Sequence, residues 1–496
     1  MKRPRLAAGV VVRRRGDGAV LLGTRTEQAR SWPGTLAFPG GAVDDDDHLL
    51  PLVSAARGES AAFRGAALRE AFEEAGLVSL ARSDGGRPDD AVVDDVVRRL
   101  RRGERLIEVL GTSALALDDR PLHDLGAWLT AEGSFLVARF FIPVDETPVL
   151  VEPPTRELTD VGFKLPQALM LGWRDGSVFL PPPIRIQLAR LAALSAADDA
   201  DDQGVAAVLR TRPNEPERRR RDLLQGVVIM DPKTPTLWPA TTTNCVVLGC
   251  GDVLLVDPAT PYPQERAAFD ELLEVTLEGR RVQGIVLTHH HLDHVGDAER
   301  LRALHGCPVY AHALTADRVD ADVDVVISDG HVFELDGGGH GPDRRFEVLF
   351  TPGHARGHIC LFEPSLRLLV AGDMVAGVGS ILIDPPEGHM ATYLASLDRL
   401  MGLQPRSIIP AHGPLLTDAM ERLQHHKAHR LAREKRVLQA IGAGAATLDA
   451  VVTAAYGPDT PGPMLVFAAR SVLAIVEKLR EDGVVAVDEH GRWLAA

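Results

Sequence analysis

The sequence predicts a multidomain α/β protein, because the chain is long and several short apolar runs each end in a polar side chain. At 496 residues it is long enough for about three domains of roughly 150 residues each. Hydrophobic residues make up 45% of the chain, which is enough to give every domain a core. Short β runs that deliver polar groups at their carboxyl ends are typical of α/β folds, which build their sites there.

The densest group of potential metal ligands follows one of these runs. Gly284–Leu287 leads into His289, His291, Asp293 and His294. Imidazoles with a carboxylate suit zinc, and the carboxylate oxygen would also serve manganese or iron. His289 and His291 point to the same side of an extended segment, whereas Asp293 and His294 lie past the turn, where they can reach a second ion. We therefore predict a site for two metal ions.

Three later apolar runs each end in one more candidate ligand. These candidates are His354, Asp373 and His412. The first comes directly after Pro352 and Gly353, a pair that favours a sharp turn at the end of the strand. The pattern predicts that all three side chains join the histidine cluster.

In order, spacing and residue type, residues 223–415 resemble a metallo-β-lactamase-fold hydrolase. The resemblance implies an αβ/βα sandwich that holds two zinc ions, or manganese or iron in their place. It implies that one ion is held by His289, His291 and His354, the other by Asp293, His294 and His412, and that Asp373 bridges both. A hydroxide between the ions would then be the nucleophile.

Three neighbouring residues receive supporting roles. Asp257, which closes the run Val253–Val256, resembles the family's carboxylate that orients a ligand histidine. His358 has two interpretations, since it resembles a substrate contact of glyoxalase II but could equally lie on the surface or support a ligand. His290 faces away from the ligands beside it, and we expect a structural role.

A second chemical signature lies near the start of the chain. Glu70, Glu73 and Glu74 are spaced i, i+3 and i+4, so their carboxylates share one face of a helix that Gly76 can end. Such clustered negative charge is costly without a cation. Magnesium or manganese fits, because both prefer oxygen ligands and complete their shells with substrate phosphates.

With Arg69 before them and the stretch from Trp32 to Gly41 upstream, these acids resemble the Nudix box. The resemblance implies an α/β/α sandwich in which Arg69 orients a metal-binding glutamate. The box is interrupted after Gly41, and such insertions resemble the coenzyme A diphosphatase branch. Either Asp44 or Glu59 could replace the displaced outer carboxylate. The alternative to an active site is a Nudix fold that serves only as a scaffold.

The predicted organisation is a Nudix domain over 1–195, a solvated linker over 196–222, the metallo-β-lactamase-fold domain over 223–415 and a tail over 416–496. The linker carries an Asp-rich run and the Arg218–Arg221 run. The tail reads as a basic helix, two more helices and a hairpin, and resembles the winged-helix tail of endoribonuclease-like relatives. His425, His426 and His429 in the basic helix form a weaker metal-site candidate, outside the strand-end pattern.

Composition limits the partners. A net charge of −15 argues against a non-specific nucleic-acid binder, although RNA held by the metals stays an alternative. The sequence shows neither a signal peptide nor an apolar run near ~18 residues, so we expect a cytoplasmic protein with no membrane partner. The four cysteines lack a metal-binding spacing and are expected to be buried free thiols. The sequence makes no prediction of the oligomeric state.

The sequence thus predicts a bifunctional metal-dependent hydrolase acting on small molecules. The catalytic residues would be Asp293 and Asp373 in the second domain, for an ester, thioester or phosphodiester, and Arg69, Glu70, Glu73 and Glu74 in the first, for a diphosphate. An acyl-coenzyme A would suit both domains, since it contains a thioester and a diphosphate. The alternative is an endoribonuclease-type phosphodiesterase with a non-catalytic, nucleotide-sensing Nudix domain.

Overall fold

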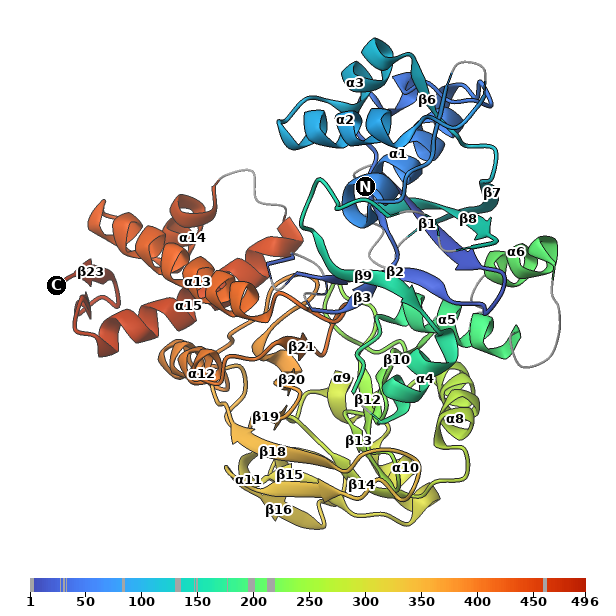
Figure 1. The fold of residues 1–496 in the computed structure, drawn as a ribbon. Coiled ribbons are helices and arrows are strands. Elements are labelled where there is room, and N and C mark those ends of the chain that lie inside the picture. The colour runs from blue at the N-terminus through green and yellow to red at the C-terminus, as the bar shows by residue number, and fades with distance from the viewer. Residues whose placement is uncertain are drawn as a thin grey trace. The chain divides into compact units, whose positions relative to one another are not determined.

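The computed structural model divides the chain into two compact units, Met1–Asn214 and Glu215–Ala496 (Figure 1). It describes residues 4–496 except 27, 30, 31, 33, 83, 84, 130–134, 147, 149, 176, 195–200, 212–218 and 458–461. Residue 33 of the stretch from Trp32 to Gly41, residues 197–200 of the Asp-rich run and Arg218 therefore lie outside the described residues.

A seven-stranded mixed sheet forms the centre of the first unit. The strand order is β3-β2-β1-β8-β7, with β4 also paired to β1 and β9 to β2. Only β1 and β8 run parallel among the strand pairs described in this sheet. The strands are β1 (Arg5–Arg14), β2 (Val20–Arg25), β3 (Leu36–Ala37), β4 (Gly40–Ala42), β7 (His123–Leu129), β8 (Phe135–Val144) and β9 (Leu158–Lys164), and β5 (Leu80–Arg82) with β6 (Leu115–Leu117) forms a separate pair.

Helices cover both faces of this sheet, which confirms the α/β/α layering predicted from the sequence. Because side chains alternate along a strand, Val10 and Val12 of β1 join the core with α1, whereas Val11 joins the core with α5 and α6. Gly76, at φ +67°, ends α1 in the left-handed conformation. The helices are η1 (Asp47–Leu49), α1 (Gly58–Ala75), α2 (Asp90–Arg101), α3 (Leu106–Ser113), α4 (Pro166–Asp175), α5 (Pro182–Leu194) and α6 (Asp202–Arg210).

Helix α6 lies in the segment predicted to be a solvated linker, and there the structure differs from the prediction. Asp201 caps the helix by accepting a hydrogen bond from the Gly204 amide, and Val205 and Leu209, one turn apart, are fully buried in the first unit. The linker prediction rested on the run of acids and missed this short apolar stripe.

The Arg run at the end of the predicted linker is also folded. Arg220 and Arg221 lie on β10 (Arg220–Leu224), which pairs with β11 (Val227–Met230). Arg221 forms an ion pair with Asp231, and Arg219 forms one with Glu265. These guanidinium groups are therefore committed to contacts within the second unit.

Two sheets form the sandwich of the second unit, with α8 and α12 on opposite outer sides (Figure 1). The first sheet has the order β10 to β16, antiparallel up to β13 and parallel from there on, and the second runs from β17 to β21. Their remaining strands are β12 (Cys245–Leu248), β13 (Val253–Val256), β14 (Val282–Val286), β15 (Val309–His312), β16 (Val325–Ile327), β17 (Val332–Leu335), β18 (Arg344–Phe350), β19 (Ile359–Glu363), β20 (Leu368–Val370) and β21 (Ser407–Ile409).

Each sheet carries its own helical layer, as an αβ/βα sandwich requires. Leu255 and Ile285 of the first sheet share a core with α8, and Leu369 and Ile408 of the second share one with α12. The helices of this sandwich are α8 (Pro263–Leu277), α9 (Leu292–Val295), α10 (Ala298–His305), α11 (Ala313–Ala316), η2 (Gly372–Met374) and α12 (Met390–Gly402). All four cysteines are buried and free, as expected.

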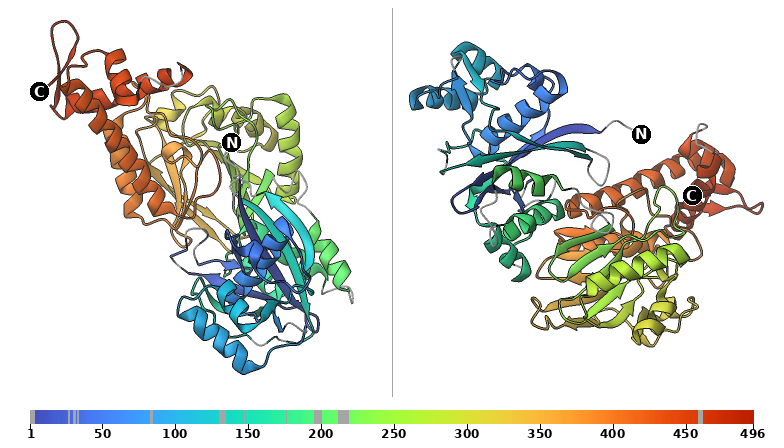
Figure 2. Two further views of the ribbon diagram at one scale, coloured as in Figure 1. Left: turned by 90° about the horizontal axis from the view of Figure 1, so that it is seen from above. Right: turned by 90° about the vertical axis from the view of Figure 1, so that its right-hand side faces the viewer.

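The tail has the predicted element order of three helices and a hairpin. It consists of α13 (Ala419–Gly442), α14 (Leu448–Tyr456), α15 (Gly462–Glu481), β22 (Val485–Val487) and β23 (Trp493–Ala495). Thr447 caps α14 by accepting a hydrogen bond from the Ala450 amide, which confirms the predicted N-cap. Helix α13 begins before the predicted His425 and leads from the sandwich to the rest of the tail (Figure 2).

Candidate metal centres

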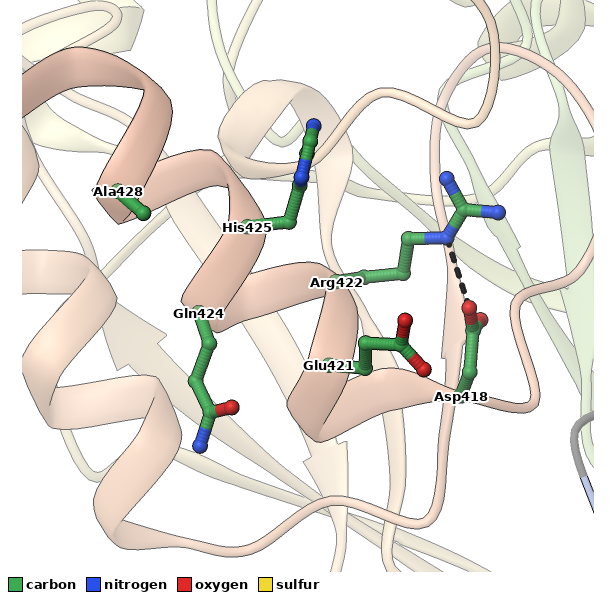
Figure 3. A pocket seen from close by; sticks show the side chains of 6 residues that line it. All are labelled: Asp418, Glu421, Arg422, Gln424, His425 and Ala428. Atoms are coloured by element: carbon green, nitrogen blue, oxygen red, sulfur yellow. Dashed lines mark hydrogen bonds and ion pairs between the residues drawn. The ribbon is translucent and has the colours of Figure 1, made fainter. Parts of the chain in front are cut away.

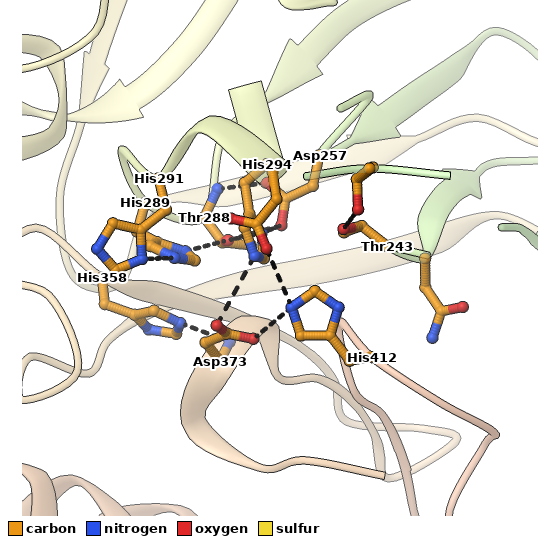
Figure 4. A network of polar contacts seen from close by, with 12 residues as sticks. Thr243, Asp257, Thr288, His289, His291, His294, His358, Asp373 and His412 are labelled. Atoms are coloured by element: carbon orange, nitrogen blue, oxygen red, sulfur yellow. Dashed lines mark hydrogen bonds and ion pairs between the residues drawn. The ribbon is translucent and has the colours of Figure 1, made fainter. Parts of the chain in front are cut away.

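Strand ends of the two sheets bring the predicted ligands of the second unit together (Figure 4). His289 and His291 follow β14, and Asp293 and His294 lie in the first turn of α9. The other three ligands each follow one strand of the second sheet: His354 comes after β18, Asp373 after β20 and His412 after β21. Gly353 permits the first of these turns, because its φ is +136° and a Cβ there would lie 2.3 Å from the Tyr393 Cα.

Four side chains form the first cluster. One potential ligand atom from each of His289, His291, His354 and Asp373 lies within 4.8 Å of the others. His291 Nδ1 lies 2.9 Å from His289 Nε2 and 3.0 Å from His354 Nε2. His354 presents Nε2 because its Nδ1–H donates to the Leu382 carbonyl at 2.8 Å.

The second cluster consists of Asp293, His294 and His412, again within 4.8 Å. Asp373 lies between the clusters. Its Oδ2 is 3.3 Å from His354 Nε2, and its Oδ1 is 3.4 Å from His412 Nε2. The structure therefore groups the seven side chains in the two clusters expected from the sequence, and the Asp373 carboxylate lies beside both, since its Oδ2 is also 3.8 Å from His294 Nε2.

Asp257 holds His294 in the orientation that a ligand needs. Its Oδ2 lies 2.8 Å from His294 Nδ1, which leaves Nε2 for the site. The carboxylate also accepts hydrogen bonds from the amide and the hydroxyl of Thr288, at 2.8 and 2.6 Å. Asp257 is buried and has a φ of +51°. Its contact with His294 Nδ1 is the one expected of a carboxylate that orients a ligand histidine.

We predict that Asp257→Asn weakens zinc binding about 10–100-fold, the usual effect of losing a group that orients a ligand histidine. The measurement is a competition titration against a chromophoric chelator. Asp252→Asn is the control, because Asp252 forms an exposed ion pair with Arg281 away from the cluster. Equal affinities in wild type and Asp257→Asn would contradict the orienting role.

Asn244 supports the His412 loop and was missed from the sequence. Its Nδ2 donates to the carbonyls of Pro410 and Gly413, at 2.7 and 2.9 Å, on either side of the histidine. His412 Nδ1 donates to the Thr242 carbonyl at 2.9 Å, which turns Nε2 toward Asp373. A lone asparagine among threonines carries no spacing signal that would reveal this role.

His358 supports Asp373 and has no exposed surface. Its Nε2 accepts a hydrogen bond from the Asp373 amide at 3.0 Å, so Nδ1 carries the proton and donates to Thr351 Oγ1 at 2.9 Å. Of the two interpretations of this histidine, the structure favours the supporting role over substrate contact. His290 is half-buried and belongs to neither ligand cluster.

Most of the imidazoles in the first cluster are neutral. Burial, with a further contribution from the neighbouring histidines, holds the pKa of His289 well below its usual range and lowers that of His291 to about 3. Burial also lowers the pKa of His354. Neutral imidazoles have a free lone pair, which is the form that binds metal.

In the second cluster, neighbouring carboxylates raise the pKa of a histidine instead of leaving it lowered by burial. Burial alone would lower the pKa of His294, but Asp257 and Asp293 raise it to about 10. Burial alone would raise the pKa of Asp373, yet His412 and His294 hold it below its usual range. A metal ion that binds at His294 must therefore displace a proton.

The residues present fit two divalent ions. Among the described residues, His294 Nε2 and Asp373 Oδ1 are buried and receive no hydrogen bond, which is costly unless an ion satisfies them. The donor set of imidazoles and carboxylates suits zinc, manganese or iron. Metal binding by these side chains stays a prediction, and zinc is the ion we propose.

In the first unit, Arg69 is held by an acid that the sequence did not reveal. Asp47, in η1, is buried and accepts two hydrogen bonds from Arg69, at 2.8 and 2.9 Å. Asp44 lies 3.6 Å from the guanidinium with 62% of its side chain exposed, and Glu59 lies exposed in the first turn of α1. Asp47 is therefore the buried acid that holds Arg69, and which acid replaces the displaced outer carboxylate stays a prediction.

The three glutamates of α1 lie against β4. Arg69 Nη1 donates to both Glu70 and Glu73, at 2.9 and 3.0 Å, and Glu74 accepts a hydrogen bond from the Gly40 amide at 2.8 Å. A Cβ on Gly41 would lie 2.5 Å from the Glu70 carboxylate, so the glycine leaves room for that side chain in its present position.

Burial raises the pKa of all three glutamates, to about 7 for Glu70 and about 8 for Glu74. The pKa values are raised because burial removes water from the charged carboxylates, and a bound cation would offset the free-energy cost of keeping them charged. The oxygen donors fit magnesium or manganese, which we propose for this site.

The remaining histidine group does not form a metal cluster among the described residues. His425 and His429 lie on one side of α13 with ring centroids 6.4 Å apart, whereas His426 is buried. The shallow pocket in Figure 3 runs along this helix and is lined by Asp418, Glu421, Arg422, Gln424, His425 and Ala428.

A larger groove, of about 840 Å³, lies within the second unit. Arg356, two residues after His354, lines it together with Pro386 and His389. Its other wall comes from the tail, where Arg480 of α15 and Val485 of β22 contribute. The tail thus helps to form this groove.

Comparison with known families agrees with this geometry. Residues 238–412 match the metallo-beta-lactamase superfamily, and residues 3–158 match the NUDIX domain. The chain belongs to the metallo-beta-lactamase superfamily. Residues 447–493 match the beta-lactamase associated winged helix domain, so the three domains occur in the predicted order. The finer domain boundaries proposed from the sequence stay a proposal.

The curated relatives named here match between about a third and just over half of the chain. The beta-lactamase-like protein 2 homolog of Caenorhabditis elegans is 27% identical over 55% of this chain and 88% of its own length. An atrochrysone carboxyl ACP thioesterase from Aspergillus novofumigatus is 26% identical, over 52% and 80%. An uncharacterized protein of Aquifex aeolicus is 30% identical, over 36% and 88%.

A solved structure shows the same fold. The beta-lactamase domain protein from Burkholderia ambifaria superposes with a TM-score of 0.50 at 19% identity, covering 58% of this chain and 95% of its own. With both enzyme domains and a thioesterase relative, the superfamily member is a hydrolase. Within the part of the chain that the structure describes, no helix combines the length and apolar character needed to cross a membrane.

Proposed function

We propose that the second unit hydrolyses a thioester whose acyl group is carried on a phosphopantetheine arm, as in acyl-coenzyme A or an acyl carrier protein. The observation that supports a dinuclear centre most strongly is the position of Asp373, whose carboxylate lies 3.3 Å from His354 Nε2 of the first cluster and 3.4 Å from His412 Nε2 of the second. The thioesterase name of one relative favours a thioester over an ester or phosphodiester.

Two bound ions would lower the pKa of a water between them and polarise the thioester carbonyl. The protein's own part is to hold each donor in place. His354 and His412 are turned by backbone carbonyls, and His294 is turned by Asp257. A thiol has a pKa of about 8.5, so the leaving group departs as a thiolate without a proton donor.

The groove that Arg356 lines supports an extended substrate. Its lining includes the guanidinium groups of Arg356 and Arg480, the carboxylates of Glu387, Glu477 and Glu481, and the apolar side chains of Val485 and Val487. Guanidinium groups suit the phosphate of a phosphopantetheine arm, and the apolar side chains suit its aliphatic part.

For the first unit we propose cleavage of the diphosphate of coenzyme A or its thioesters. Glu70, Glu73 and Glu74 would hold magnesium or manganese, and Arg69 would fix the first two through the hydrogen bonds described above. An acyl-coenzyme A would then be a substrate for both units, each at a different bond.

The test is mass spectrometry of the products after the metal-loaded protein meets a mixture of acyl-coenzyme A species. We expect free coenzyme A plus carboxylic acid from the second unit. Cleavage by the first unit would yield 3′,5′-ADP and acylphosphopantetheine. Untouched substrate would contradict the coenzyme A proposal.

Cleavage of RNA by the second unit, beside a nucleotide-sensing first unit, is the alternative that the winged-helix tail favours. The contacts of α15 give it little support. Lys478 forms ion pairs with Glu434 and Asp482, and Arg470 forms one with Asp384. Degradation of a labelled single-stranded RNA, with no thioester cleavage, would establish this alternative instead.

A further inference from the structure

Helix α13 lies between the segments that match known families, which end at residue 412 and resume at 447. It is the long helix that leads from the sandwich to the tail (Figure 2). Among its many charged residues, His426 and Arg430 are only 8% and 5% exposed. Since they are one turn apart, both lie on the same face of the helix. A buried guanidinium is costly unless it has partners.

Those partners lie in the segment that follows Asp373. Arg430 Nη2 donates to the Ile381 carbonyl and lies 3.4 Å from Ser380 Oγ. The imidazole of His426 forms a hydrogen bond with the Ala376 backbone. Two side chains of α13 thus hold the segment at two points.

Tyr393 of α12 completes this support. Its hydroxyl donates to the Met374 carbonyl at 2.8 Å, and the Arg430 guanidinium lies over its ring at 5.5 Å from the centroid. The same tyrosine packs against Gly353, the residue directly before His354. Arg430 therefore contacts both the segment and the side chain that supports it.

Both ends of the supported segment belong to the metal centre. Asp373 precedes it, and Leu382, directly after Ile381, offers the carbonyl that orients His354 at 2.8 Å. A shift of residues 374–382 would therefore move the bridging carboxylate and turn one histidine of the first cluster.

We propose that Arg430 is a positioning residue for the metal centre, acting through the Ile381 and Leu382 backbone and through Tyr393. The inference rests on the proposed function, because it assumes that the two clusters bind metal. If Arg430 has this role, α13 supports the metal centre and also connects the sandwich to the tail.

The test is the zinc affinity of Arg430→Met, measured by competition with a chromophoric chelator. Methionine keeps an apolar stem but removes the hydrogen bond to Ile381. We expect affinity to fall about 10–100-fold, as for other groups that support a ligand. The Co²⁺-substituted protein should also show an altered visible absorption spectrum, since the geometry around the ion changes.

Arg433→Met is the matched control. Arg433 lies on the same helix and places its guanidinium 3.9 Å from the centroid of Tyr456 in the tail, so its loss disturbs α13 without touching residues 374–382. We expect wild-type zinc affinity and an unchanged Co²⁺ spectrum in this variant.

Arg430→Lys keeps the test decisive if the methionine variant does not fold. Lysine can reach one acceptor but cannot stack on Tyr393 as a guanidinium does, so an intermediate affinity is expected. Wild-type affinity and spectrum in every folded Arg430 variant would overturn the inference. Failure of the wild-type protein to bind zinc would instead overturn the proposed function.

Discussion

Replacing Asp373 with alanine should abolish hydrolysis by the second unit and leave diphosphate cleavage by the first unit unchanged. The Asp373 carboxylate lies 3.3 Å from His354 Nε2 of the first cluster and 3.4 Å from His412 Nε2 of the second, so its loss would remove a donor from both. A metal centre contributes several kcal/mol to the transition state, and losing about 3 kcal/mol slows the reaction about 10²-fold. The measurement is kcat on an acyl-coenzyme A, with each product quantified separately.

Asp398→Ala is the control for this variant, since Asp398 is half-exposed and pairs only with Lys427 among the contacts described. Zinc content should fall in Asp373→Ala and stay unchanged in Asp398→Ala. Full thioester hydrolysis by Asp373→Ala would refute the bridging role. Equal loss of both activities would show that the two units are coupled.

Replacing Glu73 or Glu74 with glutamine should remove diphosphate cleavage and leave thioester hydrolysis intact. Both carboxylates are crowded by burial, which raises their pKa, and each is held beside the other proposed magnesium ligands. Glutamine keeps the shape but loses the charge, so metal binding weakens and the rate should fall by about 10²-fold or more. The release of 3′,5′-ADP measures the effect.

Glu59→Gln provides the same substitution on the same helix. Because Glu59 is exposed in the first turn of α1, this substitution should leave the rate of diphosphate cleavage unchanged. Unaltered 3′,5′-ADP release in the Glu73 and Glu74 variants would remove the catalytic proposal for the first unit and leave a Nudix fold that serves as a scaffold.

The positions of the proposed ligands in the second unit could be predicted because each one follows an apolar run. Local patterns of β-forming residues predict where each strand ends. The ligands come together because the strand ends of both sheets meet at one place. The run from His289 to His294 also carries its own spacing. The structure accordingly brings together His289, His354, Asp373 and His412, which lie far apart in the sequence.

The supporting residues could not be predicted in the same way. Asp47 is one of four consecutive aspartates, and only the tertiary structure shows which one is buried against Arg69. Leu382 supports His354 through its carbonyl, a group that every residue possesses. In the sequence, Arg430 cannot be told from the other cations of the basic helix. Its burial depends on contacts with a segment about fifty residues earlier.

The central claim is that two metal ions lie in the second unit and share Asp373. The most direct measurement is anomalous diffraction at the zinc edge from crystals of the zinc-loaded protein. We expect two peaks, one about 2.0–2.1 Å from nitrogen atoms of His289, His291 and His354 and the other at that distance from His294 and His412, with a carboxylate oxygen of Asp373 bound to each ion. A single peak, or zinc bound only at His425 and His429 on α13, would contradict the account.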